Sequence, residues 1–255
     1  MKTEIIKGIF SRRMGNPDAG KLICLHGFAD SGQMFSALSE TILSEQFELI
    51  AIDLPGFGVS PRNPTVNSIE DYANAIAQVV AVVSPDNPVG LIGHSIASAI
   101  AVAMVQKLAV TPLGVFSIEG NLTEADAYFS GQAADWDSPN AFKEAFSEQI
   151  WKAGQNSLDL RRYYAGVVMA DAEAMWNLGR DARRVSVKDA IGEAYKSLNI
   201  PTLYYWGNAT TRSSTQEFVK SNSLSNKQYR VESHWPTVTD PDSTATAIKE
   251  FFDRD

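Results

Sequence analysis

Cysteine and histidine are scarce in this sequence of 255 residues. The chain has one cysteine, Cys24, and three histidines, which are His26, His94 and His234. A single cysteine cannot form a disulfide within the chain, so the composition favours a reducing compartment, and we expect a cytoplasmic protein. Cys24 lies inside an apolar run, which is typical of a small buried side chain rather than a nucleophile. No cluster of potential metal ligands stands out, and we expect neither a metal nor another cofactor.

Positive charge is also low. The chain has 22 Lys and Arg against 30 Asp and Glu, a formal net charge of −8. We therefore expect no nucleic acid and no anionic membrane as partner, since both select basic surfaces. No apolar run approaches the roughly 18 residues of a membrane span, and the N-terminal stretch "MKTEIIKGIF" lacks the pattern of a signal peptide. A small-molecule substrate is the expected partner, and the oligomeric state stays open.

Apolar residues, at 44% of the chain, are abundant enough for a large core. Up to residue 120, short apolar runs alternate with amphipathic stretches, which predicts a mostly parallel sheet flanked by helices, that is, an α/β fold. The expected strands are 21–27, 47–56, 88–95 and 112–120, and the expected helices are 31–45, 68–84 and 96–108. Strands return at 200–207 and 227–233, before a closing helix. We expect a core domain of residues 1–122 and 197–255, with a helical cap, residues 123–196, inserted over the strand edge.

The stretch "GHSIA" at 93–97 joins an apolar strand to a helix of small residues. It places Ser95 at a sharp turn, and the small residues at 93 and 97 let strand and helix approach closely, as in a nucleophile elbow. The helix N-terminus would then face a developing oxyanion. The alternative is a serine that only caps the helix. Ser60, in the similar triplet "GVS", is a weaker candidate because no helix follows it directly.

A serine nucleophile needs a general base, and His234 is the best placed of the three histidines. It follows the last expected strand and precedes the closing helix. Because the carboxyl ends of parallel strands meet at one edge of a sheet, we expect it near Ser95.

The base in turn needs a carboxylate that holds its tautomer and stabilises the imidazolium ion. Glu119 ends the expected strand 112–120 at the same edge, and we assign it as the acid. Glu124 and Asp126 are the alternative acids, and Asn208 is a fallback that could only orient the ring.

Five motifs occur in an order that resembles the α/β-hydrolase superfamily, in particular its capped branch. They are "LHGF" (25–28), "DLPGFGVS" (53–60), "GHSIA" (93–97), "WG" (206–207) and "SHWP" followed by "DP" (233–241). The resemblance implies that Ser95 is the nucleophile and His234 the base. It also implies that the backbone N–H groups of Phe28 and Ile96 form the oxyanion hole. His26, Asp53 and Gly56 would then shape loops.

Two positions depart from the family pattern. The acid that commonly follows the "WG" strand is missing, and Thr210 stands in that region instead. Some capped members carry the acid one strand earlier, where Glu119 lies. Ala97 replaces the second glycine of the elbow.

We therefore expect a serine hydrolase that cleaves a carboxylic ester or related acyl bond of a small, apolar substrate through an acyl-enzyme on Ser95. The alternatives are a lyase, carbon–carbon hydrolase or acyl transferase with the same machinery, or a ligand-binding signalling protein on the same fold. The aromatic side chains of residues 123–196 are expected to divide between packing and the substrate cleft. Arg161 and Arg162 could bind a substrate carboxylate, but we expect them to face solvent.

Overall fold

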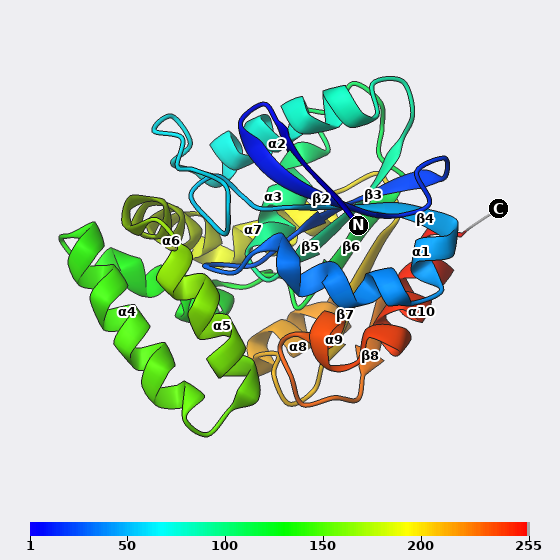
Figure 1. Ribbon diagram of the computed structural model, residues 1–255. Coiled ribbons are helices and arrows are strands. Elements are labelled where there is room, and N and C mark those ends of the chain that lie inside the picture. Colours follow the sequence, from blue (N-terminus) through cyan, green and yellow to red (C-terminus); the bar gives the residue numbers. More distant parts are fainter. Residues whose placement is uncertain (254–255) are drawn as a thin grey trace.

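The computed structural model describes residues 1–253, which form an eight-stranded sheet flanked by helices (Figure 1). The strand order is β1-β2-β4-β3-β5-β6-β7-β8. Strands β3 to β8 run parallel, whereas β2 pairs antiparallel with both β1 and β4. The strands are β1 (Lys2–Ile6), β2 (Ile9–Gly15), β3 (Gly20–Leu25), β4 (Phe47–Ile52), β5 (Val89–His94), β6 (Gly114–Ile118), β7 (Thr202–Gly207) and β8 (Asn226–Tyr229). The predicted α/β fold is confirmed.

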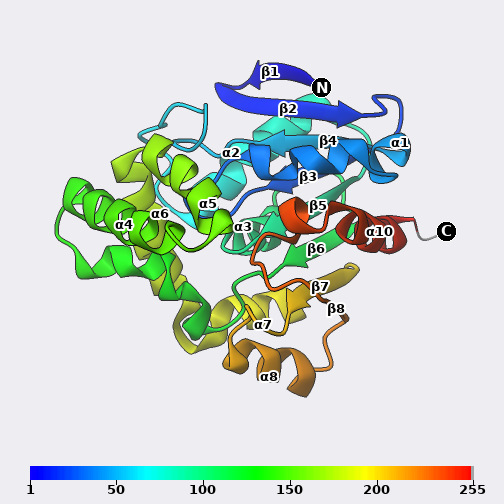
Figure 2. The same cartoon turned by 60° about the horizontal axis from the view of Figure 1, so that its bottom comes forward.

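Three of the central strands are buried along their whole length. Every residue of β4, β5 and β6 is buried, which explains why they read as continuous apolar runs. Helices α2 (Ile69–Val83) and α3 (Ala97–Met104) cover one face of the sheet, and η1 (Gly32–Glu40) and α10 (Pro241–Phe252) cover the other (Figures 1 and 2). The shorter α1 (Leu43–Gln46), α8 (Ser213–Ser221) and α9 (Pro236–Thr239) complete the core.

Residues 123–196 are helical, and most of them lie beyond the carboxyl ends of the parallel strands (Figure 2). The helices α4, α5 and α6 form most of this segment. Its elements are η2 (Glu124–Tyr128), η3 (Ser130–Asp135), α4 (Pro139–Gly154), α5 (Leu158–Met169), α6 (Ala172–Ser186), η4 (Val187–Asp189) and α7 (Ala190–Lys196). The last of these, α7, contacts both α3 and α6, so it connects the segment to the sheet layer.

Several elements differ from the sequence expectation. The helices α8 and α9 are not among the expected ones, and the expected strand 227–233 ends at Tyr229. The expected helix 31–45 is a 3₁₀ helix followed by the single turn α1, because the hydroxyls of Ser39 and Thr41 donate to the carbonyls of Ser36 and Leu38 and compete with regular helix bonding. The hairpin β1–β2 is not among the expected strands, since charged residues interrupt its apolar pattern. Lys7 and Gly8 form its turn, both with positive φ.

No helix within residues 1–253 is both long enough and apolar enough to cross a membrane.

Candidate active site

Ser95 lies at a sharp turn between β5 and α3, with φ = 54°. A non-glycine residue seldom adopts this left-handed conformation, so the surrounding contacts must hold it. The N–H of Ser95 donates to the carbonyl of Ile118 at 2.9 Å. A Cβ atom on Gly93 would lie 2.7 Å from the carbonyl oxygen of Ala97, so only glycine allows the strand and helix to approach this closely. The turn therefore has the geometry of a nucleophile elbow.

Glu119 follows β6 directly and points its carboxylate at the imidazole of His234. Its Oε2 lies 2.5 Å from Nδ1 of His234, and its Oε1 accepts from the N–H of Gly207 at 3.0 Å. The hydroxyls of Thr210 and Tyr229 also contact Oε1. Burial raises the pKa of Glu119, but the hydrogen bond and charge of His234, with the two hydroxyls, outweigh burial and lower the pKa to about 2. The carboxylate is therefore ionised at neutral pH.

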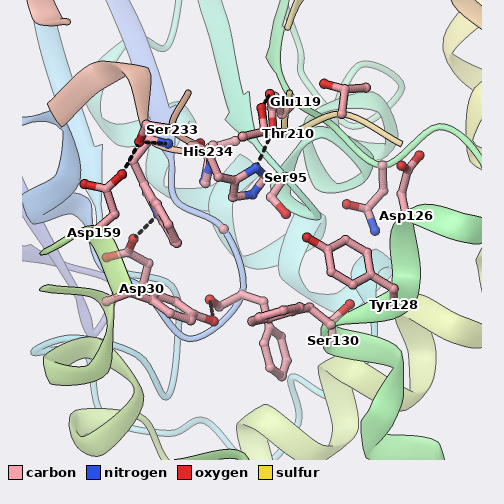
Figure 3. Close-up of a pocket in the computed structure, with 18 of the residues that line it drawn as sticks. Asp30, Ser95, Glu119, Asp126, Tyr128, Ser130, Asp159, Thr210, Ser233 and His234 are labelled. Carbon is pink, nitrogen blue, oxygen red and sulfur yellow. Dashed lines mark hydrogen bonds and ion pairs between the residues drawn. The ribbon is translucent and has the colours of Figure 1, made fainter. Parts of the chain in front are cut away.

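His234 lies on the loop between β8 and α9, with its imidazole between Glu119 and Ser95 (Figure 3). An ionised carboxylate only accepts hydrogen bonds, so Nδ1 of His234 carries a proton and donates a hydrogen bond to Glu119. This leaves Nε2 as the basic nitrogen of the imidazole. The three residues that the sequence analysis assigned as nucleophile, acid and base line one pocket, and two of them, Glu119 and His234, are paired.

Phe28 and Ile96 stand on the loop after β3 and at the start of α3. Neither backbone N–H donates a hydrogen bond to any residue in the range 1–253. The loop turns sharply after Phe28: Ala29 has φ = 52° and the N–H of Asp30 donates to the carbonyl of Gly27 at 3.3 Å. Both free N–H groups thus remain available for an oxyanion, and their role stays a prediction.

His26 and His94 are buried and neutral. Burial lowers the pKa of His26, and it lowers that of His94 well below its ordinary value. Nε2 of His26 accepts from the N–H of Leu54 at 3.0 Å, so it shapes the loop as expected. Nε2 of His94 lies 2.8 Å from the carbonyl of His234 and donates to it, a loop contact that the sequence did not indicate.

The other candidates occupy structural positions. Asp126 accepts from the N–H of Leu122 and of Thr123 and caps η2, and Glu124 is exposed. Ser60 donates to the carbonyl of Asp53 at 2.6 Å. The lining of the cavity that contains Ser95 does not include Glu124, Ser60 or Asn208.

That cavity has a volume of about 310 Å³. Its wall mixes aromatic and polar side chains. The aromatic ones are Phe28, Tyr128, Phe129, Tyr163, Tyr204 and Trp235. Five residues with a carboxylate, Asp30, Glu119, Asp126, Asp159 and Glu232, line the cavity, whereas Arg212 is the one lysine or arginine in the lining of the described chain. Within residues 1–253, no group of three or more His, Cys, Asp or Glu side chains is arranged to hold a metal ion.

The sequence analysis missed the roles of three residues at or beside the pocket. Thr210, three residues after β7, and Tyr229, the last residue of β8, contact Glu119 through their hydroxyls, and their residue types alone carry no such signal. Asn121 is 2% exposed, and its side-chain nitrogen has no hydrogen-bond partner within the described chain. Its position two residues after Glu119, at the same strand end, was the only available signal.

Comparison with known proteins identifies the family. The profile of the Alpha/beta hydrolase family matches residues 22–247. The chain belongs to this family. The predicted superfamily is thereby confirmed, and a hydrolase is supported at the level of the family.

Among curated proteins, this family member is 29% identical over 133 residues to Norfluorocurarine synthase 2 of Strychnos nux-vomica, covering 49% of this chain and 50% of that protein. The chain therefore spans about half the length of this relative. Among solved structures it resembles an esterase from Thermogutta terrifontis, with a TM-score of 0.75, 17% identity and coverage of 99% of this chain and 98% of that chain. It also resembles the N-acyl homoserine lactonase AidH, with a TM-score of 0.77, 16% identity and coverage of 98% and 96%. At these identities the structures show the shared fold.

Proposed function

We propose that the protein is a serine hydrolase that cleaves a carboxylic ester, or a related acyl bond, of a small substrate. The observation that carries the proposal is the pairing of Glu119 Oε2 with Nδ1 of His234 at 2.5 Å, beside a serine held at φ = 54°. With Nδ1 bound to the carboxylate, the other imidazole nitrogen is free to act as the base for the serine hydroxyl.

In the proposed first step, Nε2 of His234 takes the proton of Ser95 as the serine oxygen bonds to the acyl carbon. The carbonyl oxygen gains the negative charge and accepts hydrogen bonds from the N–H groups of Phe28 and Ile96. The intermediate then collapses, and the leaving alkoxide takes the proton from His234.

In the second step, water gives a proton to His234 and attacks the acyl carbon. The bond to Ser95 breaks, and the serine oxygen recovers its proton. Glu119 stays ionised throughout, which agrees with a pKa near 2.

The pocket supports a small substrate. A cavity of about 310 Å³ accommodates a short acyl or alcohol group, and the aromatic wall favours apolar groups. The excess of carboxylates over cationic side chains disfavours a negatively charged substrate. We therefore propose a neutral ester with a mainly apolar acyl group.

The test combines a fluorophosphonate probe with two chromogenic esters, p-nitrophenyl acetate and butyrate. We expect mass spectrometry to find the probe on Ser95, and we expect Ser95→Ala to lose both labelling and hydrolysis. Ser60→Ala is the matched control and should retain both. Undiminished hydrolysis by Ser95→Ala, or a label on another residue, would refute the proposal.

A further inference from the structure

One turn of α5 contacts both loops that carry the proposed reaction centre. We call residues 159–163 the docking turn, residues 27–30 the oxyanion turn and residues 233–235 the histidine loop. Figure 3 shows Asp159 beside Ser233, and the side chain of Asp30 on the same side of the pocket. The docking turn lies in the helical segment, whereas both loops belong to the sheet layer.

The first contact holds the oxyanion turn. The hydroxyl of Tyr163 donates to the carbonyl of Phe28 at 2.7 Å, and the Tyr163 side chain is buried. One turn further along α5, a Cβ atom on Gly166 would lie 2.6 Å from the carbonyl oxygen of Ala29. The helix backbone therefore packs directly on a turn in which Ala29 has a positive φ. Such a turn keeps its conformation only when its surroundings hold it.

The second contact joins the helix and both loops through one carboxylate. Arg162 donates to Oδ1 and Oδ2 of Asp30 at 3.2 and 2.8 Å. The indole N–H of Trp235 donates to the same Oδ2 at 3.0 Å. Asp30 belongs to the oxyanion turn, and Trp235 directly follows His234. Because Asp30 is only 2% exposed, these partners replace the water that its carboxylate oxygens lose on burial.

The third contact holds the other side of the histidine loop. The hydroxyl of Ser233 donates to Oδ2 of Asp159 at 2.5 Å. The rings of Tyr163 and Trp235 pack with centroids 5.2 Å apart. His234 is thus flanked on both sides by residues that the docking turn contacts.

We propose that the docking turn positions the reaction centre, with Arg162 and Tyr163 as positioning residues for the Phe28 N–H and the His234 imidazole. The oxyanion turn and the histidine loop reach their working geometry when α5 is docked on them. The inference rests on the proposed function, since it concerns the same chemistry at Ser95. It also assigns Arg162 to a buried carboxylate of the protein rather than to solvent or substrate.

The helix itself offers matched controls. Arg161 donates to the carbonyls of Gly154 and Gln155, and the ring of Tyr164 packs on Trp151. Both neighbours therefore contact α4 instead of the two loops. The informative pairs are Tyr163→Phe with Tyr164→Phe, and Arg162→Ala with Arg161→Ala. Arg162→Lys, which keeps the charge, tests rescue.

The measurements are kcat and KM for p-nitrophenyl acetate, the same constants for its thionoester, and the thermal unfolding midpoint. N–H donors bind an oxyanion better than a thiolate-like sulfur, so the oxo-to-thiono rate ratio reports the oxyanion hole. We expect Tyr163→Phe and Arg162→Ala to lower kcat by about 10- to 100-fold, because a small displacement of the reacting groups has an effect of this size. We also expect a smaller oxo-to-thiono ratio, a KM within about 2-fold of wild type and partial rescue by Arg162→Lys.

Unchanged kcat and rate ratio in Tyr163→Phe and Arg162→Ala would overturn the inference, as would equal losses in the two controls. If Arg162→Ala unfolds, Tyr163→Phe decides, because it removes a single hydroxyl. Failure of the proposed function has a different signature. In that case the wild-type protein shows no label on Ser95, and Ser95→Ala keeps its activity.

Discussion

Replacing Glu119 by glutamine tests the site most sharply, because the shape is kept while the charge is lost. In the wild-type protein, Oε1 accepts from the N–H of Gly207 and Oε2 accepts from Nδ1 of His234. Glutamine has one acceptor oxygen and one NH₂ group, so it cannot accept at both places. If the amide oxygen of this glutamine accepts from the N–H of Gly207, the amide NH₂ donates to Nδ1 of His234. The proton of the imidazole must then lie on Nε2. The imidazole then cannot take the proton of Ser95.

We expect this change to lower kcat for p-nitrophenyl acetate by about 10³- to 10⁴-fold, the range for a triad whose acid becomes an amide. Glu124→Gln removes an exposed carboxylate five residues away and should keep the wild-type rate. A wild-type rate in Glu119→Gln, or a similar loss in both variants, would refute the assignment of the acid.

The same substitution has a pH-dependent effect on stability. The pKa of Glu119 falls from its ordinary value of 4.5 to about 2 on folding, which corresponds to roughly 3 kcal/mol. Because the folded-state pKa is the lower one, this contribution is present above pH 4.5 and is lost as the pH falls toward 2. Urea unfolding should show the difference between wild type and Glu119→Gln shrinking in that window, with roughly half gone by about pH 3. A difference that is constant from pH 7 to pH 3 would contradict the pKa argument.

Three further predictions concern the support of the acid, the elbow and the pocket charge. Tyr229→Phe removes a hydrogen-bond donor to Glu119. We expect kcat to fall by about 5- to 50-fold, with the thermal unfolding midpoint nearly unchanged. A larger effect on KM than on kcat would contradict the role of Tyr229 in supporting the acid. Gly93→Val would bring a side chain to within 2.7 Å of the carbonyl oxygen of Ala97. We expect the free energy of unfolding, measured in urea, to fall by more than about 3 kcal/mol. A wild-type urea midpoint would show that the turn accepts a larger side chain at this position. The carboxylate-rich pocket should give p-nitrophenyl butyrate a kcat/KM about 10-fold above that of the hemisuccinate at low salt, with the gap narrowing in 1 M salt. Equal kcat/KM values for the two esters at low salt would show that the charge of the pocket does not determine specificity.

Much of the architecture was predictable because the central strands are mostly apolar. A strand buried on both faces has few polar positions, so β4 and β5 stand out as nearly continuous apolar runs despite Glu48 and His94. The elbow was equally visible, since glycine and alanine around Ser95 leave few alternatives to a tight strand-to-helix turn. The hairpin β1–β2 was missed, because Lys2 and Glu4 in β1 and the adjacent Arg12 and Arg13 in β2 interrupt its apolar pattern.

The partners of the reactive groups were less visible in the sequence. Thr210 was noted only as the place where a familiar acid is absent, yet its hydroxyl donates to Glu119. Tyr229 reaches the same oxygen from β8. Arg161 and Arg162 are adjacent and chemically identical, so composition could not tell which one contacts the sheet layer.

The sequence by itself determined the alternation of the central strands with helices and the strand-to-helix turn at Ser95, and it led to Glu119 and His234 as the proposed acid and base. These depend on local periodicity and on the rule that parallel strands end at one edge. Only the tertiary structure decided which side chains surround Glu119 and which turn of α5 meets the loops at Phe28 and His234. Such contacts join residues up to 205 positions apart, as for Asp30 and Trp235, and depend on how helices rotate and pack, which local patterns do not encode.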